Sequence, residues 1–325
     1  MTTVRAVGVG CGHYLPERVV TNEELSKRLE TSDEWIRTRS GICQRHVAAE
    51  GQLTSDLAIR AADAALTAAG LGASDLDAIL IATATPDQTF PSTATRVQHS
   101  LGMSNGYAFD LQAVCAGFVF ALANANGLIL SGMADRVMVI GAETFSRILD
   151  WEDRSTAVLF GDGAGAVILQ RQDGTGTTSD RGILGTCLHS DGAHNQILYV
   201  SGGPSTTQDA GVLKMEGKEV FKHAVIKLAA VADEVMEKAG VASEDVDWVV
   251  PHQANNRIIA STAKKAGIPM EKVIVTVQDH GNTSAASIPM ALSAGISDGR
   301  IQPGHLLLME AIGGGLAWGS ALIRW

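Results

Sequence analysis

The stretch AFDLQAVCAGFVFALANANGLILSG, from Ala108 to Gly132, places one cysteine, Cys115, between a strand pattern and a helix pattern. Ala108 to Leu111 are typical of the end of a short buried strand. Ala116 to Leu130 carry almost no charge, and Gly132 is a suitable residue to follow a helix, so we expect a helix buried on all sides. A thiol in the first helical turn lies near the positive end of the helix dipole, which favours the thiolate. The alternative is an inert packing residue, because free cysteines are commonly buried.

Composition restricts the classes of protein that this chain can be. Its 325 residues are 46% hydrophobic and 18% charged, which predicts a compact globular protein. The net charge of -10 disfavours nucleic acid as a general partner. The first ten residues do not resemble a targeting leader, and no segment is apolar enough to span a bilayer, so we expect a cytoplasmic protein. The four cysteines, Cys11, Cys43, Cys115 and Cys187, form no CxxC pair, and we expect free thiols with no metal site.

An internal repeat organises the chain. Ala69-Gly70-Leu71 matches Ala239-Gly240-Val241 as a helix end, and Asp75-Leu76-Asp77 matches Asp245-Val246-Asp247 as the approach to a strand; both pairs are 170 positions apart. A chance match of helix end, spacer and strand start is improbable. The later strands expected in the two halves are Tyr107 to Leu111 and Arg136 to Gly141 in the first, and Val273 to Val277 and His305 to Glu310 in the second.

Each half therefore alternates helices with strands, which predicts parallel strands, right-handed crossovers and helices on both faces of each sheet. We expect an α/β protein of two duplicated halves around one core. The division falls in the Gly/Thr/Ser-rich segment Asp173 to Asp180, giving halves of residues 1–173 and 174–325. Ligands bind outside the carboxyl ends of parallel strands, where three polar segments are expected. These are Cys115, Pro251 to Asn255 and His280 to Ser284.

Two chemistries are compatible with Cys115, His252 and Asn282. In a cysteine hydrolase, histidine activates the thiol and asparagine orients the histidine. In an enzyme that condenses thioesters, histidine and asparagine instead donate hydrogen bonds to a thioester carbonyl as an enolate forms. A histidine after a strand can also be purely structural. His280 is a competing base close to Asn282, so the pattern alone leaves the assignment open.

Glycine-rich segments suggest an anion site but no nucleotide cofactor. Gly313-Gly314-Gly315 permits a turn that brings backbone N–H groups near a ligand, which suits an oxyanion hole. The alternative, a tight hairpin into a last strand at Ala317 to Ile323, is compatible with that role. Neither Gly161 to Gly165 nor Gly8 to Gly12 has GxGxxG spacing before a helix, so we reject a dinucleotide site.

Basic residues gather in two places in this acidic chain. Arg257 and Lys264 are seven positions apart and share a face of one predicted helix with Lys265 nearby. That face could dock an acidic partner, although a solvated helix face is the simpler alternative. Trp35 and Arg39 offer a stacking surface and a phosphate-binding cation on a short helix that Ser32 caps. The alternative for the tryptophan is partial burial in the core.

Taken together, six motifs resemble the β-ketoacyl-acyl carrier protein synthase III family, condensing enzymes of the thiolase superfamily. The resemblance covers nearly the whole chain. It implies the thiolase fold, a duplicated five-layer αβαβα arrangement, in a homodimer that joins a short acyl-CoA, most simply acetyl-CoA, to malonyl-acyl carrier protein and so starts fatty acid synthesis. The motifs are TSDEWIRTRSGI (Thr31 to Ile42), AVCAGF (Ala113 to Phe118), FGDGAGA (Phe160 to Ala166), VPHQAN (Val250 to Asn255), HGNTSAAS (His280 to Ser287) and GGG with WGSAL (Gly313 to Leu322).

The resemblance also implies a role for individual residues. Cys115 would be the nucleophile, the N–H groups of Cys115 and Gly314 would hold the oxyanion, and His252 and Asn282 would bind the malonyl thioester. Coenzyme A would be a substrate, with no separate cofactor. The remaining residues are Thr31, Trp35, Arg39, Arg154 and Asn255 for coenzyme A, with the adenine between Trp35 and Arg154; Lys222, Arg257, Lys264 and Lys265 for the acyl carrier protein; and Phe90 for the partner subunit's acyl pocket.

The chain departs from the family pattern at three places. Ile312 and Leu316 replace aromatic residues that often flank the triple glycine, and Ile197 to Gly211 matches no family pattern and is expected to border the acyl pocket. The length of the primer is therefore open. Alternatives are a priming ketosynthase or acyltransferase of secondary metabolism with the same fold, a Cys-His-Asn thioester hydrolase, and a non-catalytic carrier-binding subunit.

Overall fold

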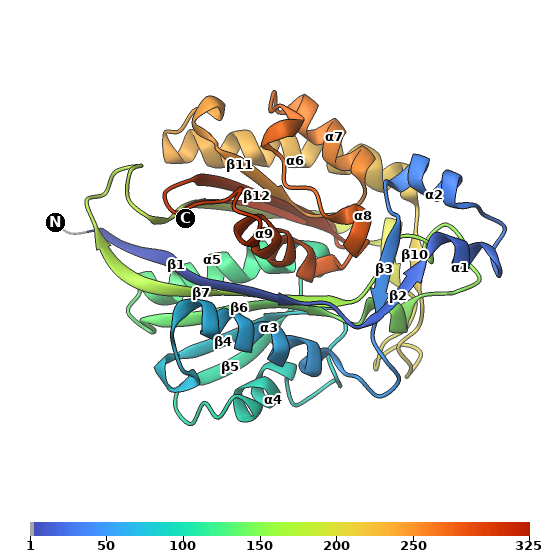
Figure 1. Ribbon diagram of the computed structural model, residues 1–325, viewed down its shortest axis with the longest axis horizontal. Coiled ribbons are helices and arrows are strands. Elements are labelled where there is room, and N and C mark those ends of the chain that lie inside the picture. The colour runs from blue at the N-terminus through green and yellow to red at the C-terminus, as the bar shows by residue number, and fades with distance from the viewer. Residues whose placement is uncertain (1–2) are drawn as a thin grey trace.

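Two β-sheets form the framework of the protein. The computed structural model describes residues 3–325 (Figure 1). The first sheet has the order β1 (Thr3–Tyr14), β7 (Gly163–Gly174), β6 (Arg136–Glu143), β4 (Ala78–Ala82) and β5 (Tyr107–Leu111). The second has the order β11 (Trp248–Pro251), β12 (Leu306–Gly313), β13 (Ala317–Arg324) and β8 (Gly182–Ser190). The chain passes from the first sheet to the second between β7 and β8.

Helices cover both sheets and fill the space between them. Figure 1 shows α3 and α4 below the first sheet, α6 and α7 above the second, and α5 and α9 between the two sheets. The expected five-layer αβαβα order is therefore confirmed. The bounds are α3 (Thr54–Ala69), α4 (Thr93–Ser100), α5 (Gly117–Leu130), α6 (Gly217–Ala239), α7 (Asn256–Lys265) and α9 (Ser287–Ser297). Among residues 3–325, no helix is both long enough and apolar enough to cross a membrane.

The sequence repeat corresponds to a repeat in the structure. β4 and β11 begin 170 positions apart, at Ala78 and Trp248, and β6 and β12 begin at Arg136 and Leu306, also 170 apart. The matching aspartates perform the same task, because the Asp77 carboxylate accepts the Arg136 N–H at 2.8 Å and the Asp247 carboxylate accepts the Leu306 N–H at 2.7 Å. Each aspartate thus joins the starts of two neighbouring parallel strands.

The prediction of parallel sheets is correct only for the strands that alternate with helices. β4 pairs in parallel with β5 and β6, and β11 pairs in parallel with β12. The remaining pairs, β1 with β7, β6 with β7, β12 with β13 and β13 with β8, are antiparallel. Both sheets are therefore mixed, and the hairpin from β12 into β13 is the turn expected at the triple glycine.

The predicted strand at Val273 to Val277 is wrong. Val273 makes only an isolated bridge to Val249, and a short helix, α8 (Val277–His280), follows. The cause is the side chain of Gln253, whose Oε1 accepts the N–H groups of Thr276 at 2.8 Å and Val277 at 3.1 Å. A side chain thus takes the backbone groups that a neighbouring strand would have paired.

Two expectations for the stretch around Cys115 also need correction. β5 lies at the edge of its sheet and is partly exposed, with Phe109 at 36% exposure, rather than buried. Helix α5 ends as predicted at Leu130, Ser131 caps it, and Gly132 follows with a φ of 74°. However, Asn124 and Leu130 in its second half are exposed, so the helix is fully enclosed only at the end next to Cys115.

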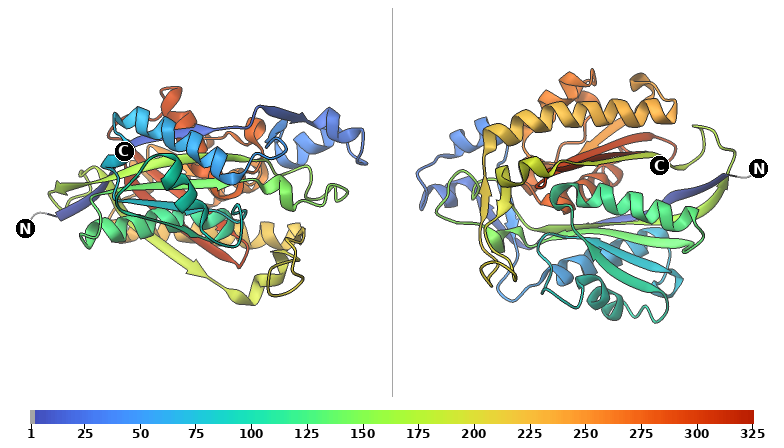
Figure 2. Two further views of the ribbon diagram at one scale, coloured as in Figure 1. Left: turned by 90° about the horizontal axis from the view of Figure 1, so that it is seen from below. Right: turned by 180° about the vertical axis from the view of Figure 1, so that it is seen from behind.

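One end of the molecule carries an additional small unit. It consists of β2 (Arg18–Thr21), α1 (Asn22–Ser26), α2 (Asp33–Ser40) and β3 (Gln44–Val47) (Figures 1 and 2), and it contacts the main body through α2 against α7 and β3 against α8. A separate two-stranded sheet is formed by β9 (Leu198–Val200) and β10 (Leu213–Met215). The fully buried Arg45 anchors the small unit by donating to the carbonyls of Val20 at 3.1 Å and Val158 at 2.6 Å. The unit is therefore fixed to the main body.

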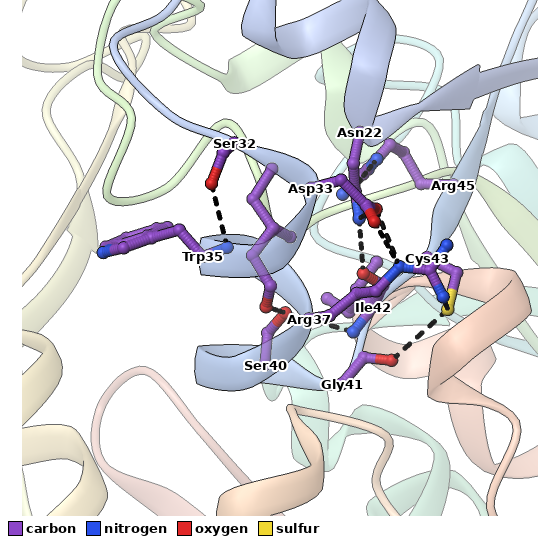
Figure 3. Close-up of polar contacts among 11 residues, drawn as sticks. Asn22, Ser32, Asp33, Trp35, Arg37, Ser40, Gly41, Ile42, Cys43 and Arg45 are labelled. Atoms are coloured by element: carbon purple, nitrogen blue, oxygen red, sulfur yellow. Dashed lines mark hydrogen bonds and ion pairs between the residues drawn. The ribbon is translucent and has the colours of Figure 1, made fainter.

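Polar contacts inside this unit set the position of α2 (Figure 3). Ser32 caps the helix by accepting the Trp35 N–H at 3.1 Å, as predicted. Asn22 donates to the Asp33 carboxylate and to the Ile42 carbonyl, both at 2.8 Å. In Figure 3 the Trp35 ring points away from these contacts. The unit therefore presents Trp35 at the rim of the cavity described next.

Candidate active site

Cys115, His252 and Asn282 line the same cavity of about 550 Å³. The two halves of the chain contribute to it, and the expectation that these three residues converge is confirmed. Its outer part is lined by Trp35 and Arg39 from α2. The remaining wall is largely apolar, with Phe145, Phe160, Leu198, Phe221 and Ile312 among its residues. The cavity thus leads from a cationic rim, along apolar walls, to a buried thiol.

Tight backbone packing holds Cys115 in place. It lies in a short 3-10 helix, η2 (Val114–Ala116), directly before α5, and only 4% of it is exposed. A Cβ atom added to Gly313 would lie 2.7 Å from the Cys115 nitrogen, a distance that side chains do not adopt. The first glycine of the triple-glycine motif therefore allows the β12–β13 turn to lie against the nucleophile candidate.

The thiol is protonated in the free protein, contrary to the expectation from the helix dipole. Burial raises the pKa of the Cys115 thiol to about 12, and the nearby Glu143 carboxyl adds to that shift. Desolvation disfavours the thiolate and so opposes the effect expected from the start of α5. Any reaction of Cys115 must therefore transfer its proton as the new bond forms.

Glu143 is a buried acid near the thiol that sequence analysis overlooked. Its carboxylate accepts the Thr85 hydroxyl at 2.5 Å and the Ala84 N–H at 3.1 Å. Burial nevertheless raises its pKa to about 7. Its position at the end of β6 offered no signal in the sequence, because the strand pattern alone does not show that the last side chain turns inward.

His252 is held firmly at the end of β11. Its backbone N–H donates to the Glu310 carbonyl at 2.8 Å, and its Nδ1 lies 2.7 Å from the Ser287 hydroxyl. Burial lowers the pKa of His252 to about 3, so the imidazole is neutral at physiological pH. The ring therefore meets a substrate as a neutral hydrogen-bonding group.

The side-chain amide of Asn282 has a defined orientation. Its Oδ1 accepts the Ser284 N–H at 2.9 Å, so its Nδ2 is the atom left to donate into the cavity. The backbone of Asn282 is bonded on both sides, donating to the Leu159 carbonyl and accepting the Gly161 N–H at 2.9 Å each. The glycine-rich FGDGAGA segment thus supports Asn282 through Gly161 and continues into β7 from Gly163.

His280 does not compete with His252 for Cys115. It is absent from the residues that line the cavity, and its ring lies 6.2 Å from that of His13 on β1. Burial lowers the pKa of His280 to about 4. The structure thus resolves the ambiguity in the sequence by separating the two histidines.

The triple glycine offers an unpaired N–H at Gly314, the residue after the glycine that packs against Cys115. Among residues 3–325, the Gly314 N–H has no hydrogen-bond acceptor, and a Cβ atom at this position would lie 2.6 Å from the Leu198 carbonyl. Ile312 and Leu316, which replace the aromatic residues common in the family, are buried with Ala224 and Leu228 of α6. These substitutions therefore leave the turn well packed.

Only some of the residues expected to bind coenzyme A line the cavity. Trp35, Arg39 and Asn255 line the cavity, whereas Thr31 and Arg154 do not. The Arg154 guanidinium lies 5.1 Å from the centre of the Trp35 ring and donates to the Glu30 carbonyl at 2.6 Å. An adenine between Trp35 and Arg154 therefore requires these two side chains to separate first.

The four residues expected to bind a carrier protein are exposed near the same opening. Lys222 forms an ion pair with Glu219 at 3.7 Å, and Arg257 lies 5.6 Å from the centre of the Phe221 ring and lines the cavity. Lys264 and Lys265 are exposed at the end of α7. Three of the four cations therefore extend along α7 from the cavity opening.

A second cavity, of about 900 Å³, adjoins the first. Val114, Phe145 and Leu198 line both cavities and so form the wall between them. Residues from the segment Ile197 to Gly211 line the second cavity, which fits the expectation that this segment borders an acyl pocket. Phe90 is 80% exposed and lines neither cavity of its own chain.

Comparison with known proteins agrees with this arrangement. Models of 3-oxoacyl-[acyl-carrier-protein] synthase III match residues 109–192 and, for its C-terminal part, residues 236–325. The solved 3-oxoacyl-[acyl-carrier-protein] synthase III of Aquifex aeolicus VF5 superposes with a TM-score of 0.93 and 48% identity, covering 98% of this chain and all of that one. A priming β-ketosynthase from the R1128 polyketide pathway has a TM-score of 0.91 and 33% identity, covering 99% of this chain and 96% of that one.

Relatives found by sequence share a higher identity with this chain than these solved structures do. The β-ketoacyl-[acyl-carrier-protein] synthase III of Jannaschia sp. (strain CCS1) is 68% identical over 324 residues, which cover 99% of each chain. Both the identity and the coverage extend across the two halves that together form the cavity around Cys115. The chain therefore belongs to the β-ketoacyl-[acyl-carrier-protein] synthase III family.

Proposed function

We propose that the chain joins a short acyl-CoA, most simply acetyl-CoA, to malonyl-acyl carrier protein by decarboxylative Claisen condensation and so begins fatty acid synthesis. The observation that carries this proposal is one cavity that holds a buried thiol, a neutral imidazole and an oriented amide. The neutral imidazole and the amide can both donate hydrogen bonds to a developing enolate. This role suits them better than that of a base in hydrolysis. The reaction uses two thioester substrates and needs no separate cofactor.

In the first step, the Cys115 sulfur attacks the acyl-CoA carbonyl. A bond forms between that sulfur and the acyl carbon, and the bond from the acyl carbon to the coenzyme A sulfur breaks. Because burial keeps Cys115 protonated, its proton leaves with the coenzyme A thiolate as the free thiol. The N–H groups of Gly314 and Cys115 would stabilise the tetrahedral oxyanion.

In the second step, malonyl-acyl carrier protein occupies the channel that coenzyme A has left. The side chains of His252 and Asn282 donate to its thioester carbonyl. The bond between the α-carbon and the carboxylate breaks and releases carbon dioxide, and the resulting enolate carbon attacks the acyl group on Cys115. The cysteine leaves as a thiolate and takes up a proton from water. Because the acyl-enzyme forms and coenzyme A leaves before the second substrate binds, the kinetics are ping-pong.

The partners follow from this chemistry and from the surface. The exposed cations Lys222, Arg257, Lys264 and Lys265 support docking of an acidic carrier protein. The exposed Phe90 supports a homodimer in which each subunit places this ring at its partner's acyl pocket. A cytoplasmic location is part of the proposal, because both thioester substrates are cytoplasmic metabolites.

A role in priming polyketide synthesis is the second candidate, because a protein with that printed function shares the fold at 33% identity. The 68% identity to a β-ketoacyl-[acyl-carrier-protein] synthase III favours fatty acid synthesis. A series of acyl-CoA primers with malonyl-acyl carrier protein separates the two. We expect the highest condensation rate with acetyl-CoA; a strong preference for longer or unusual primers would favour the second candidate.

The variants His252→Ala and Asn282→Ala test the mechanism. We expect each to retain acylation of Cys115 and to reduce malonyl decarboxylation by about 100-fold, because one donor to the developing enolate is lost. The two steps are followed separately, by mass spectrometry of the acyl-enzyme and by carbon dioxide release. Equal losses in both steps, with free acid as the product, would instead indicate a hydrolase.

A further inference from the structure

The hydrogen bonds around Ser287 determine which nitrogen of His252 carries the proton. Ser287 is the first residue of α9, is 2% exposed, and places its Oγ 2.7 Å from His252 Nδ1. The same oxygen accepts the backbone N–H of Gln253 at 3.3 Å. Ser287 therefore contacts both the ring of His252 and the peptide that follows it.

The Ser287 hydroxyl has one acceptor available for its own proton. A serine hydroxyl donates one hydrogen and accepts up to two. The Gln253 N–H occupies one accepting position, and among the described residues His252 Nδ1 is the one acceptor within hydrogen-bonding distance. The Ser287 proton therefore points to Nδ1.

The opposite arrangement leaves a buried donor without a partner. If Nδ1 carried the proton, Ser287 Oγ would accept from both His252 and Gln253, and its own hydrogen would have no acceptor. At 2% exposure, no bulk solvent is available to supply one, and such a buried donor is unfavourable. A neutral imidazole carries one proton, so Nδ1 must be bare and Nε2 protonated.

Resting on the condensing function proposed above, we propose that Ser287 is a positioning residue that fixes His252 as the Nε2–H tautomer, so that His252 serves as a hydrogen-bond donor to the malonyl thioester and not as the base for Cys115. His252 lines the cavity beside Cys115 and Asn282. Its Nε2 has no protein partner among residues 3–325, which leaves this N–H for a substrate oxygen. Sequence analysis quoted Ser287 within HGNTSAAS but gave it no role.

The tautomer can be observed directly in the unmodified protein. In 15N-histidine-labelled full-length protein, the His252 resonances are those that disappear in His252→Ala. We expect His252 Nδ1 at the shift of an unprotonated ring nitrogen and Nε2 at that of a protonated one. The reverse assignment would overturn the proposal, whether or not the protein condenses its substrates.

A set of variants tests the effect on the reaction. We expect Ser287→Ala to lower malonyl decarboxylation by on the order of tenfold, the equivalent of one hydrogen bond, and to leave the rate of Cys115 acylation nearly unchanged. Ser287→Thr keeps the hydroxyl and should recover most of the lost rate. The tautomer signals of Ser287→Ala should show both ring forms.

A matched control lies on the same helix. Ser293 is 5% exposed and its hydroxyl lies 2.8 Å from His13 Nδ1, so Ser293→Ala also removes a buried serine–histidine contact, but one outside the cavity. We expect Ser293→Ala to leave decarboxylation unchanged. Equal loss of acylation and decarboxylation in Ser287→Ala would contradict the proposal. If the wild-type protein formed no condensed product, the proposed function would fail, and the nitrogen shifts would still decide the tautomer.

Discussion

Gly313 and Cys115 show how closely two backbone segments approach at the reacting centre. A Cβ atom at Gly313 would lie 2.7 Å from the Cys115 nitrogen and 2.8 Å from the Ala113 carbonyl oxygen. Both neighbours are backbone atoms, which cannot rotate away. A glycine in the triple-glycine motif is thus required by this contact as well as by the turn itself.

Gly313→Ala should therefore displace Cys115. We expect acylation by acetyl-CoA to fall at least about tenfold and the free energy of unfolding to fall by about 1–3 kcal/mol, as for other overpacked sites. Gly127→Ala in α5 is the control, because no atom lies within 4 Å of its added Cβ. The control should be neutral or stabilised by about 0.5–1 kcal/mol. Unchanged acylation in Gly313→Ala would contradict this account of the turn.

At the scale of elements, one side chain decides whether residues 274–277 form a strand. Gln253 binds the backbone of this segment three times, donating to the Ile274 carbonyl at 3.0 Å and accepting from Thr276 and Val277. The equivalent segment of the first half is the edge strand β5. The second half thus replaces a strand with a loop that carries the chain toward His280 and Asn282.

Gln253→Ala should loosen that loop. We expect amide hydrogen exchange at Thr276 and Val277 to become at least about tenfold faster, since each loses a hydrogen bond to a buried acceptor. Gln253→Glu retains an acceptor oxygen and should protect these amides more than alanine does. Exchange at both amides that matched the wild-type rate in Gln253→Ala would show that the loop is held by other contacts.

Features of the fold that follow from the spacing of residues could be predicted from the sequence, whereas features that depend on a single distant contact could not. The repeat of two α/β halves and the convergence of Cys115, His252 and Asn282 were predictable because they depend on periodicity and on strand ends, whereas the five-layer order was implied by the family resemblance. The loop at residues 274–277 was not, because its cause is one distant side chain. The protonated thiol of Cys115 was not either, since its pKa depends on burial by segments that are distant in the sequence, such as the β12–β13 turn.

At the scale of the whole molecule, stability should depend on a buried acid in the second sheet. Glu310 lies on β12, is 4% exposed, and its Oε2 has no hydrogen-bond partner among residues 3–325. Burial raises its pKa to about 8 from the ordinary value of 4.5. The folded chain therefore keeps this proton over a pH range in which the unfolded chain has released it.

The sign of the effect follows from this difference. The contribution of Glu310 to stability is complete below about pH 4.5 and is lost as the pH rises through about 8. Glu310→Gln cannot ionise, so it should be less sensitive than wild type to a change from pH 5 to pH 8 in urea unfolding. Glu237→Gln, on the exposed face of α6, should behave like wild type. Parallel pH profiles for wild type and Glu310→Gln would contradict the assignment.

The central claim is that Cys115 carries the acyl group between two thioester substrates, and intact-mass spectrometry tests it most directly. After exposure to acetyl-CoA, the wild-type protein should gain one acetyl group, as should Cys187→Ser, which alters another buried cysteine, whereas Cys115→Ser should gain none. Addition of malonyl-acyl carrier protein should then discharge the adduct into a β-ketoacyl carrier protein. An adduct that persists in Cys115→Ser, or one that discharges only to free acetate, would contradict the account.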